Sequence, residues 1–397
     1  MKLTPAVFMN EAEQMSDQIT AWRRDIHQHP ELRFTEVRTA GIVADHLQAL
    51  GMEVKTGVGK TGVTGLLRGT SDTPVVLLRF DMDALPIQEE TPVEYASKIP
   101  GVMHACGHDT HVAMGLAAAS LLSLHRAELA GSVKFVFQPA EEGAGGALAM
   151  IADGVLEDPK PDYAFGMHID ATRPKGTVAI GEGYVLAAAD EFHIHIQGKG
   201  GHGALPELTS DPLMAGVQIV NALQTIISRN TGLLDLALIS VCSFEAGHAF
   251  NIIPETAELS GTIRTYEPAI QKMVYQRMKE IVHHTALASG VKAELEIRQI
   301  VSAAWNDPKM AVLSRRIAGE IPAIRHIETD YRVSPSDDLA EFLAAAPGCD
   351  LIIGASLGSG YFHHHPRFDI DETAMPVGGA LIASITADLL SSTKKEE

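Results

Sequence analysis

Polar residues of the kinds that bind metals follow several apolar, strand-like runs of this 397-residue chain. The clusters are Asp81 with Asp83, Cys106 with His108, Glu141 with Glu142, His168, and His364 with His365. In an open α/β sheet the ends of parallel strands meet at one crevice, so ligands that are distant in sequence can come together there. Thiolate and imidazole groups beside carboxylates suit zinc or a neighbouring transition metal. Because the candidates outnumber the ligands of one closed structural site, the pattern indicates a metal centre that does chemistry and has room for two ions.

The segment MHACGHDTH holds Cys106 and His108 two positions apart. In an extended loop both side chains would point the same way, and a thiolate beside an imidazole makes half of a zinc site. The alternative is a buried cysteine next to a histidine that caps a helix. His104 and His111 have compatible spacing, but a histidine at the start of a helix more often packs or orients a ligand than binds the metal.

Two adjacent carboxylates, Glu141 and Glu142, follow the strand-like run VKFVFQ. One can bind metal while the other serves as general base, since zinc lowers the pKa of a bound water towards about 7. His168 follows the run YAFGM, and of the three adjacent residues His363–His365 at least one must point away from any single ion. Asp81 is a candidate for orienting a metal-bound histidine, with a turn or cap role as the alternative.

The elements that would position these residues alternate between helical and strand-like patterns. We expect an amphipathic helix at residues 10–29 and a second helix at residues 36–50. Strands are expected at VTGLLRG, VVLLRF, VKFVFQ and YAFGM, and a buried helix at AMGLAAASLLSLHR. This alternation predicts an α/β fold with a mostly parallel sheet flanked by helices on both faces.

The pattern changes near Val185. FHIHIQG alternates strictly between apolar and polar residues, and a helix, two strands, a long helix and a last strand follow it. This order is β-α-β-β-α-β, the split motif of ferredoxin-like sheets. We therefore expect residues 187–299 to form an inserted domain, and residues 1–186 and 300–397 to form the metal-binding domain.

The inserted segment carries polar residues that could contact a substrate. His202 stands in the glycine-rich stretch GKGGHGALP, Asn251 precedes Ile252, and Arg264 lies in the strand-like GTIRTY. An imidazole can donate a hydrogen bond to a developing oxyanion, and an arginine can hold a carboxylate through two parallel bonds. Each residue taken alone is more often structural.

The composition excludes several classes of protein. The net charge of −19 argues against a nucleic-acid partner, which would call for a basic patch. The first residues lack the apolar region of a secretory signal, and no run of about 18 apolar residues predicts a membrane span. Three cysteines, Cys106, Cys242 and Cys349, do not make a disulfide framework. We therefore expect a cytoplasmic protein in a reducing compartment.

Eight motifs occur together and in order between about His27 and Thr373: HQHPEL, RFDMDALP, MHACGHDTH, FQPAEEG, GKGGHGALP, NIIPE, GTIRTY and HHPRFDIDE. The set resembles the aminoacylase/carboxypeptidase family of dinuclear metallohydrolases, in the branch of hippurate hydrolase, N-acyl-L-amino acid amidohydrolase and indole-acetyl-amino-acid hydrolase. The resemblance implies a catalytic α/β domain interrupted by a smaller lid domain, through which many members form homodimers or larger homo-oligomers.

The resemblance also implies a role for each candidate residue. The ligands of two divalent ions (zinc, manganese, cobalt or nickel) would be Cys106, His108, Glu142, His168 and His364. His364 is preferred to its neighbours because the family's ligand stands two positions before a proline, here Pro366. Glu141 would be the general base, and His202 would polarise the scissile carbonyl, from the partner subunit in dimeric relatives. Asn251 and Arg264 would bind the substrate, and Arg264 would contact the free carboxylate of the substrate.

The implied reaction is hydrolysis of the amide bond of an N-acyl amino acid or short peptide, which releases a carboxylic acid and an amino acid. The alternatives are a metallo-carboxypeptidase or dipeptidase, and a non-catalytic metal-stabilised binding protein. Three departures from the family pattern concern substrate preference rather than the metal set: IDATRP after His168, Glu207 where many relatives carry histidine, and SPSDDLAEF in place of a Ser-Glu-Asp-Phe stretch.

Overall fold

The structure is a computed structural model that describes residues 3–391. Within these residues the chain divides into two compact units. The first unit runs to Val185 and also includes Trp305–Arg332 and the chain from Asp337 onward. The second unit comprises Leu186–Ala304 and the short segment Val333–Ser336.

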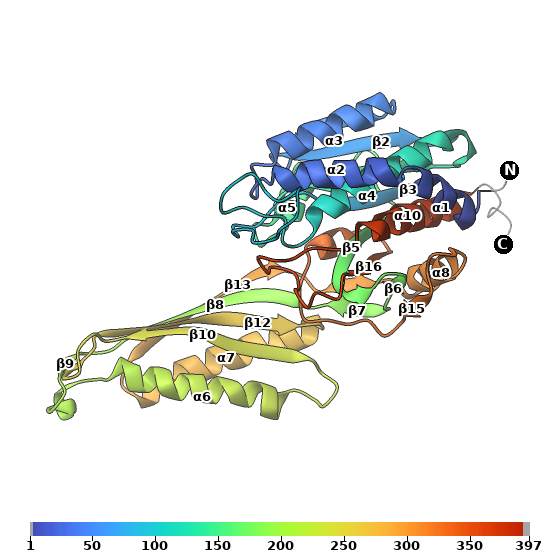
Figure 1. Cartoon of the computed structure of the whole chain (residues 1–397). Coiled ribbons are helices and arrows are strands. Elements are labelled where there is room, and N and C mark those ends of the chain that lie inside the picture. The colour runs from blue at the N-terminus through green and yellow to red at the C-terminus, as the bar shows by residue number, and fades with distance from the viewer. Residues whose placement is uncertain (1–2, 392–397) are drawn as a thin grey trace. The chain divides into compact units, whose positions relative to one another are not determined.

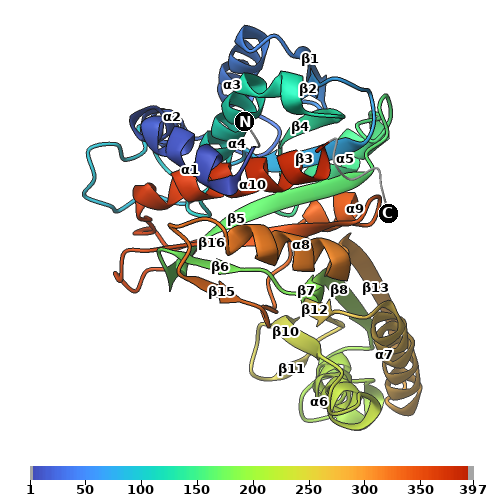
Figure 2. The same cartoon turned by 90° about the vertical axis from the view of Figure 1, so that its right-hand side faces the viewer.

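The described part of the first unit is built on an eight-stranded sheet with the order β1-β2-β4-β3-β5-β16-β6-β15 (Figures 1 and 2). The strands are β1 (Glu53–Val58), β2 (Gly62–Arg68), β3 (Val75–Asp81), β4 (Ser132–Gln138), β5 (Tyr163–Pro174), β6 (Thr177–Ala179), β15 (His326–Glu328) and β16 (Gly348–Ser356). The central neighbours β4, β3, β5 and β16 run parallel, whereas β1, β2 and the β16–β6 pair contribute antiparallel contacts. The expected mostly parallel sheet is therefore confirmed.

Helices cover both faces of this sheet (Figure 2). They are α1 (Pro5–Gln14), α2 (Ser16–Gln28), α3 (Val37–Ala49), α4 (His108–Leu124), α5 (Gly146–Ala152), α8 (Pro308–Ala318), α9 (Leu339–Leu343) and α10 (Met375–Leu389), with 3-10 turns at Arg126–Glu128 and Glu372–Ala374. Side chains alternate along a strand, and β5 illustrates the two faces. Met167 packs against Gly378 of α10, whereas Gly166 faces Leu339 of α9.

Helix α4 is the central helix of the first unit, and its residues are buried almost throughout. It lies close to β3 and β4, since a Cβ at Gly115 would come within 2.7 Å of the Phe80 ring and 2.9 Å of the Phe137 ring. The small side chains of AMGLAAAS allow this approach, which fixes the N-terminus of α4 beside the carboxyl ends of the strands.

The helix expected over residues 10–29 is instead two helices, broken at Met15 (φ −93°, ψ 4°). Phe8 of α1 and Ile19 and Ile26 of α2 all belong to the same core. The break lets two differently directed apolar faces reach that core, which the continuous 3.6-residue pattern did not indicate.

The second unit contains, in its described residues, a four-stranded antiparallel sheet of order β10-β12-β8-β13. Its strands and helices follow along the chain as β8 (Ala188–Gln197), α6 (Pro212–Asn230), β10 (Ala237–Ala246), β12 (Thr256–Thr265), α7 (Pro268–Ala288) and β13 (Lys292–Val301). Phe192, Ile194 and Ile196 are fully buried in a core with both helices, whereas His193 and His195 are exposed on the other face. The strict alternation of FHIHIQG therefore has the expected structural cause.

The remaining elements of the described residues are short. They are β7 (Gly183–Leu186) paired with β14 (Ala304–Asn306), β9 (Gly201–His202) paired with β11 (Ile252–Ile253), and the 3-10 turn Pro206–Leu208. Among the described residues, no helix combines the length and the apolar character that crossing a bilayer requires.

Candidate metal centre

The sequence-predicted ligands come from four places in the first unit. Cys106 and His108 flank Gly107, whose backbone is left-handed (φ 92°), so the loop turns there and His108 becomes the first residue of α4. The segment is thus not the extended loop that the spacing suggested. Glu142 follows β4, and His364 follows β16. His168 lies within β5, which continues to Pro174 rather than ending at the histidine as expected.

The structure brings these residues together. Metal-binding atoms lie within 4.8 Å of one another in four overlapping sets: Cys106, Glu142 and His364; Cys106, His168 and His363; His108, Glu141 and Glu142; and His108, His111 and His168. The Cys106 sulfur is 3.5 Å from Nε2 of His168, and Nε2 of His364 is 3.1 Å from Oε1 of Glu142. Because the sets share members, they form one centre.

The donor set fits divalent metal ions. It combines a thiol, imidazoles and carboxylates, which suit zinc and its neighbours. Nε2 of His108 is buried and has no hydrogen-bond partner among residues 3–391, although buried polar atoms are normally paired. The other ring nitrogen, Nδ1, lies 2.9 Å from the backbone oxygen of Asp83. A ring that donates through Nδ1 leaves Nε2 free to bind a metal.

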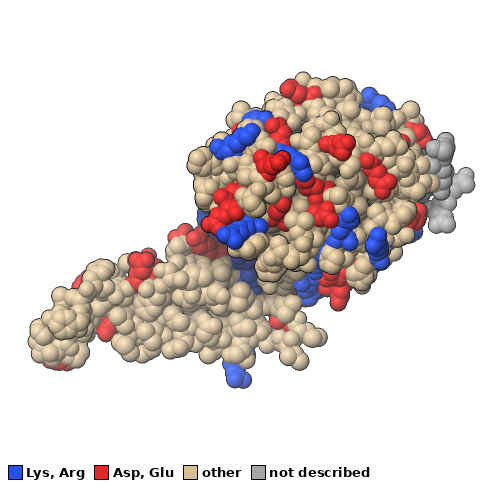
Figure 3. Space-filling view, in the orientation of Figure 1, with Lys and Arg blue, Asp and Glu red and all other residues tan. Residues whose placement is uncertain are grey.

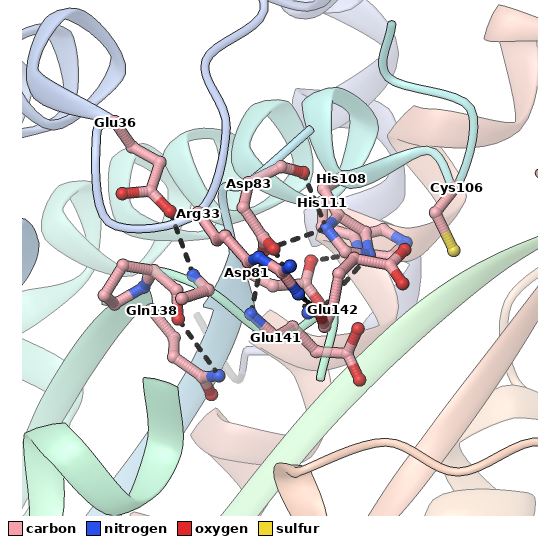
Figure 4. Close-up of polar contacts among 12 residues, drawn as sticks. Arg33, Glu36, Asp81, Asp83, Cys106, His108, His111, Gln138, Glu141 and Glu142 are labelled. Atoms are coloured by element: carbon pink, nitrogen blue, oxygen red, sulfur yellow. Dashed lines mark hydrogen bonds and ion pairs between the residues drawn. The ribbon is translucent and has the colours of Figure 1, made fainter. Parts of the chain in front are cut away.

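Asp83 organises the centre, and sequence reasoning gave it no role of its own. Its two carboxylate oxygens accept the backbone N–H groups of Glu141 and Glu142 at 3.0 and 3.1 Å. Figure 4 shows Asp83 lying between His108 and the two glutamates. One aspartate thus fixes a candidate ligand, the candidate base and His108 relative to one another. The only sequence signal for it was its position two residues after Asp81 at a strand end.

Asp81 acts on the centre through other side chains. Its carboxylate contacts Nη1 of Arg79 at 2.6 Å and Nδ1 of His111 at 2.5 Å. His111 in turn accepts the backbone N–H of Ile169 through Nε2 at 2.9 Å. Asp81 is therefore linked to the residue after His168, and it is 3.8 Å from Nε2 of His108.

Two non-glycine residues at the centre have left-handed backbone: Ala140 (φ 54°) and His364 (φ 66°). Such conformations are unfavourable outside glycine and persist where the surroundings enforce them, often at functional sites. The Ala140 N–H donates to the buried Glu36 carboxylate at 2.9 Å, and the His364 N–H donates to the Ala105 carbonyl at 2.7 Å. Both turns bring a candidate ligand or base into place.

The remaining sequence-predicted residues lie in the second unit. His202 of β9 pairs with Ile252 of β11, and the carbonyl of Asn251 accepts the N–H of Gly203 at 2.9 Å, so His202 and Asn251 are neighbours. Arg264 pairs with Ala189, at the opposite end of β8 from the segment that leads to His202. At about 3.3 Å per residue, the length of β8 separates Arg264 from that segment.

Comparison with known proteins identifies the class of this centre. Residues 77–388 match the model of peptidase family M20/M25/M40. The chain belongs to this family. A thermostable carboxypeptidase 1 of Saccharolobus solfataricus is 38% identical over 376 residues (93% of this chain, 94% of the relative). An N-acetylcysteine deacetylase of Bacillus subtilis is 38% identical over 375 residues (94% and 97%).

A solved M20 structure supports the two-ion interpretation. The Bacillus subtilis YXEP protein, described as a dinuclear metal binding peptidase, superimposes with a TM-score of 0.84 at 34% identity, covering 95% of this chain and 99% of that one. This M20 chain is thus a metal-dependent hydrolase of the amidohydrolase and peptidase class.

The electrostatics of this M20 centre depend on a buried arginine. Arg79 is 1% exposed and pairs with Asp81, Asp337 and Asp338 at 2.6 to 2.9 Å. The two aspartates belong to SPSDDLAEF, and their carboxylates lie within 4.8 Å of that of Glu141. Burial and then these carboxylates raise the pKa of Glu141 well above its usual range. Burial lowers the pKa of His168 well below its usual value.

Proposed function

We propose that this chain hydrolyses the amide bond of N-acyl amino acids. Cys106, His108, Glu142, His168 and His364 would hold two divalent ions, which when bound act as Lewis acids toward the carbonyl and the attacking water. The observation that carries the proposal is the different surroundings of two adjacent glutamates. Glu142 meets Cys106 and His364, whereas Glu141 faces Asp337 and Asp338. A structural metal site has no need of the second carboxylate.

Glu141 is the general base in this proposal. Its carboxylate takes a proton from water as the oxygen forms a bond to the amide carbon. When the C–N bond breaks, the same carboxyl returns the proton to the leaving nitrogen, so that a carboxylic acid and an amine are formed. The hydrogen bond that the backbone N–H of Glu141 donates to Asp83 holds the backbone of the base in place during both transfers.

Residues of the second unit would complete the site. His202 is exposed and its Nδ1 accepts the N–H of Ala204 at 3.0 Å, so Nε2 carries the hydrogen that could be donated to the oxyanion. Arg264 would bind the substrate carboxylate, and Asn251 would also contact the substrate. Since His202 and Arg264 lie at opposite ends of β8, one substrate that used both would take one of them from a second chain.

The second unit, with a ferredoxin-like arrangement over residues 187–299, would accordingly serve as lid and dimerisation domain. Strand β10 is an edge of its sheet, and Leu238 and Phe244 on it are 45% and 38% exposed. Met214 of α6 is 50% exposed, and the face of this unit seen in Figure 3 carries few charged side chains. Unpaired strand edges with exposed apolar side chains are normally covered by a partner. The proposed assembly is a homodimer.

The experiment that tests the function is a substrate panel. Purified protein is stripped of metal, reloaded with zinc, manganese, cobalt or nickel, and assayed with N-acetyl and N-benzoyl amino acids and with dipeptides. Faster hydrolysis of the acylated amino acids supports the proposal. Faster hydrolysis of dipeptides or of C-terminal residues supports the carboxypeptidase alternative, which the similarity to the thermostable carboxypeptidase favours.

If stripping unfolded the protein and no reloaded form hydrolysed any amide, the non-catalytic, metal-stabilised alternative would replace both. The proposed location is the cytoplasm, since the Cys106 thiol must stay reduced to bind metal.

A further inference from the structure

His363 stands next to the candidate ligand His364, and both of its ring nitrogens contact backbone. Nδ1 is 3.1 Å from the carbonyl oxygen of Cys106, and Nε2 is 3.3 Å from the backbone nitrogen of Ala171. A backbone N–H only donates, so Nε2 must accept, and Nδ1 carries the hydrogen that is donated to the carbonyl. One neutral tautomer satisfies both contacts.

The hydrogen bond to Ala171 takes the place of a backbone pairing that β5 lacks beyond Gly166. Along β5 the N–H groups of alternate residues point to alternate neighbours, and the Ala164 N–H donates to Pro347, on the β16 side. The N–H groups of Ile169 and Ala171 therefore point to the β3 side. Pairing with β3 ends at Gly166. Beyond that residue, His111 accepts the N–H of Ile169 and His363 accepts that of Ala171.

His363 thereby joins two segments that carry candidate ligands. It connects the Cys106 carbonyl to β5 three residues after His168, and its ring packs edge to face on that of His168 with centroids 5.2 Å apart. We propose that His363 is a positioning residue of the metal centre, which holds the Cys106 sulfur and Nε2 of His168 at the spacing needed for a shared ion. This inference rests on the proposed metal-dependent function.

His363 could instead be a ligand, since its ring lies with Cys106 and His168 in one of the candidate sets. Binding metal through Nε2 would leave the N–H of Ala171, a residue that is 7% exposed, without its partner. Binding through Nδ1 would release the Cys106 carbonyl. The hydrogen bonds thus favour a positioning role, and the two roles predict different metal stoichiometry.

The test uses three variants of the full chain. His363→Phe keeps the ring size and removes both nitrogens, His363→Asn can still donate near the Nδ1 position, and His363→Gln can still accept near the Nε2 position. His365→Phe is the matched control, because His365 is exposed in the same loop and stacks on Tyr361 rather than on a candidate ligand. Each protein is stripped and titrated with Co²⁺, and the thiolate-to-cobalt absorption band, the number of ions bound and the dissociation constant are measured.

For His363→Phe we expect unchanged stoichiometry, a weaker or shifted thiolate band, and a loss of about 10- to 100-fold in affinity. The Asn and Gln variants should fall between it and the wild type, the His365→Phe control should match the wild type, and the Ala171 amide should exchange its hydrogen faster in His363→Phe. If His363→Phe fails to fold, the Asn and Gln variants decide.

An unchanged band and affinity would overturn the inference, and so would the loss of a whole equivalent of metal, since that would make His363 a ligand. If the wild type itself bound no metal, the proposed function would fail rather than this role alone.

Discussion

At the scale of single residues, neighbouring side chains of the same type in this centre make different contacts. Glu141 and Glu142 both donate their N–H groups to Asp83, yet only Glu142 contacts His364. His363 and His364 differ in the same way, since the first contacts backbone and the second contacts a carboxylate. The left-handed backbone of His364 separates their directions. Residue type alone makes such neighbours equivalent. The family resemblance separates them in the sequence, and the backbone conformation gives them different contacts in the structure.

Glu141→Gln should remove the proposed base and keep the ligands. We expect kcat to fall by about 10²- to 10⁴-fold, the range that general-base catalysis contributes, while the metal content measured by mass spectrometry stays at the wild-type value. Glu142→Gln is the matched control and should lose metal as well as activity. Substantial turnover by Glu141→Gln would exclude Glu141 as the base.

The buried side chain of Asp350, which is not one of the proposed ligands, leads to a prediction of how the stability of the protein depends on pH. It is 2% exposed, neither carboxylate oxygen has a hydrogen-bond partner in the described part of the chain, and burial raises its pKa to about 8. The unfolded chain releases this proton near pH 4, so between about pH 4 and 8 the folded state binds one proton more than the unfolded state. Stability should therefore fall as the pH rises through this window, by at most about 1.4 kcal/mol per pH unit from this group.

Asp350→Asn should remove that dependence. Urea unfolding at pH 5, 7 and 9 should show the variant gaining stability over the wild type as the pH rises. Asp45→Asn, at an exposed position of α3, is the control and should leave the pH profile unchanged. A parallel profile for Asp350→Asn and the wild type would mean that Asp350 is not protonated in the folded state.

At the scale of elements, the strand ends determine where the candidate ligands meet. The apolar runs predicted β3, β4 and β5, and with them the sheet edge where the candidate ligands meet, because parallel strands buried on both faces leave a clear sequence signal. The sequence did not indicate that β5 continues beyond its pairing with β3, or that Asp83 accepts hydrogen bonds from two backbone N–H groups. It also did not indicate that Met15 separates two helices, α1 and α2. Each of these depends on contacts between segments that are distant in the sequence, which side-chain periodicity does not encode.

Substitution of two helical glycines by alanine should change the stability of the protein in opposite directions. Gly115 of α4 has no room for a Cβ beside Phe80, so Gly115→Ala should destabilise the protein by about 1–3 kcal/mol and weaken metal binding through the displaced His108. Gly41 of α3 has nothing within 4 Å of its Cβ position among the described residues, so Gly41→Ala should stabilise by about 0.5–1 kcal/mol. Thermal unfolding and Co²⁺ titration of both variants measure this contrast, and equal effects would show that α4 does not need its close approach to β3.

At the scale of the whole molecule, the proposed dimer makes a quantitative prediction. If His202 acts in the partner's site, a His202→Ala homodimer and a Glu141→Gln homodimer should each be inactive. Dissociating and reassociating an equal mixture gives half heterodimers, each with one intact site, and therefore about a quarter of wild-type activity. Light scattering coupled to gel filtration checks that the mixture is dimeric. A mixture that stays inactive would place His202 and Glu141 of one chain in the same site.

The first unit is assembled from stretches of chain on both sides of the second. During synthesis, Cys106, His108, Glu142 and His168 leave the ribosome first, but β16 and His364 emerge only after the entire insertion. A nascent chain that ends within the insertion therefore lacks β16, which is one of the two strands that pair with β5, and the last of the proposed ligands. The proposed five-ligand centre can therefore be complete only after the residues that follow the insertion have been made.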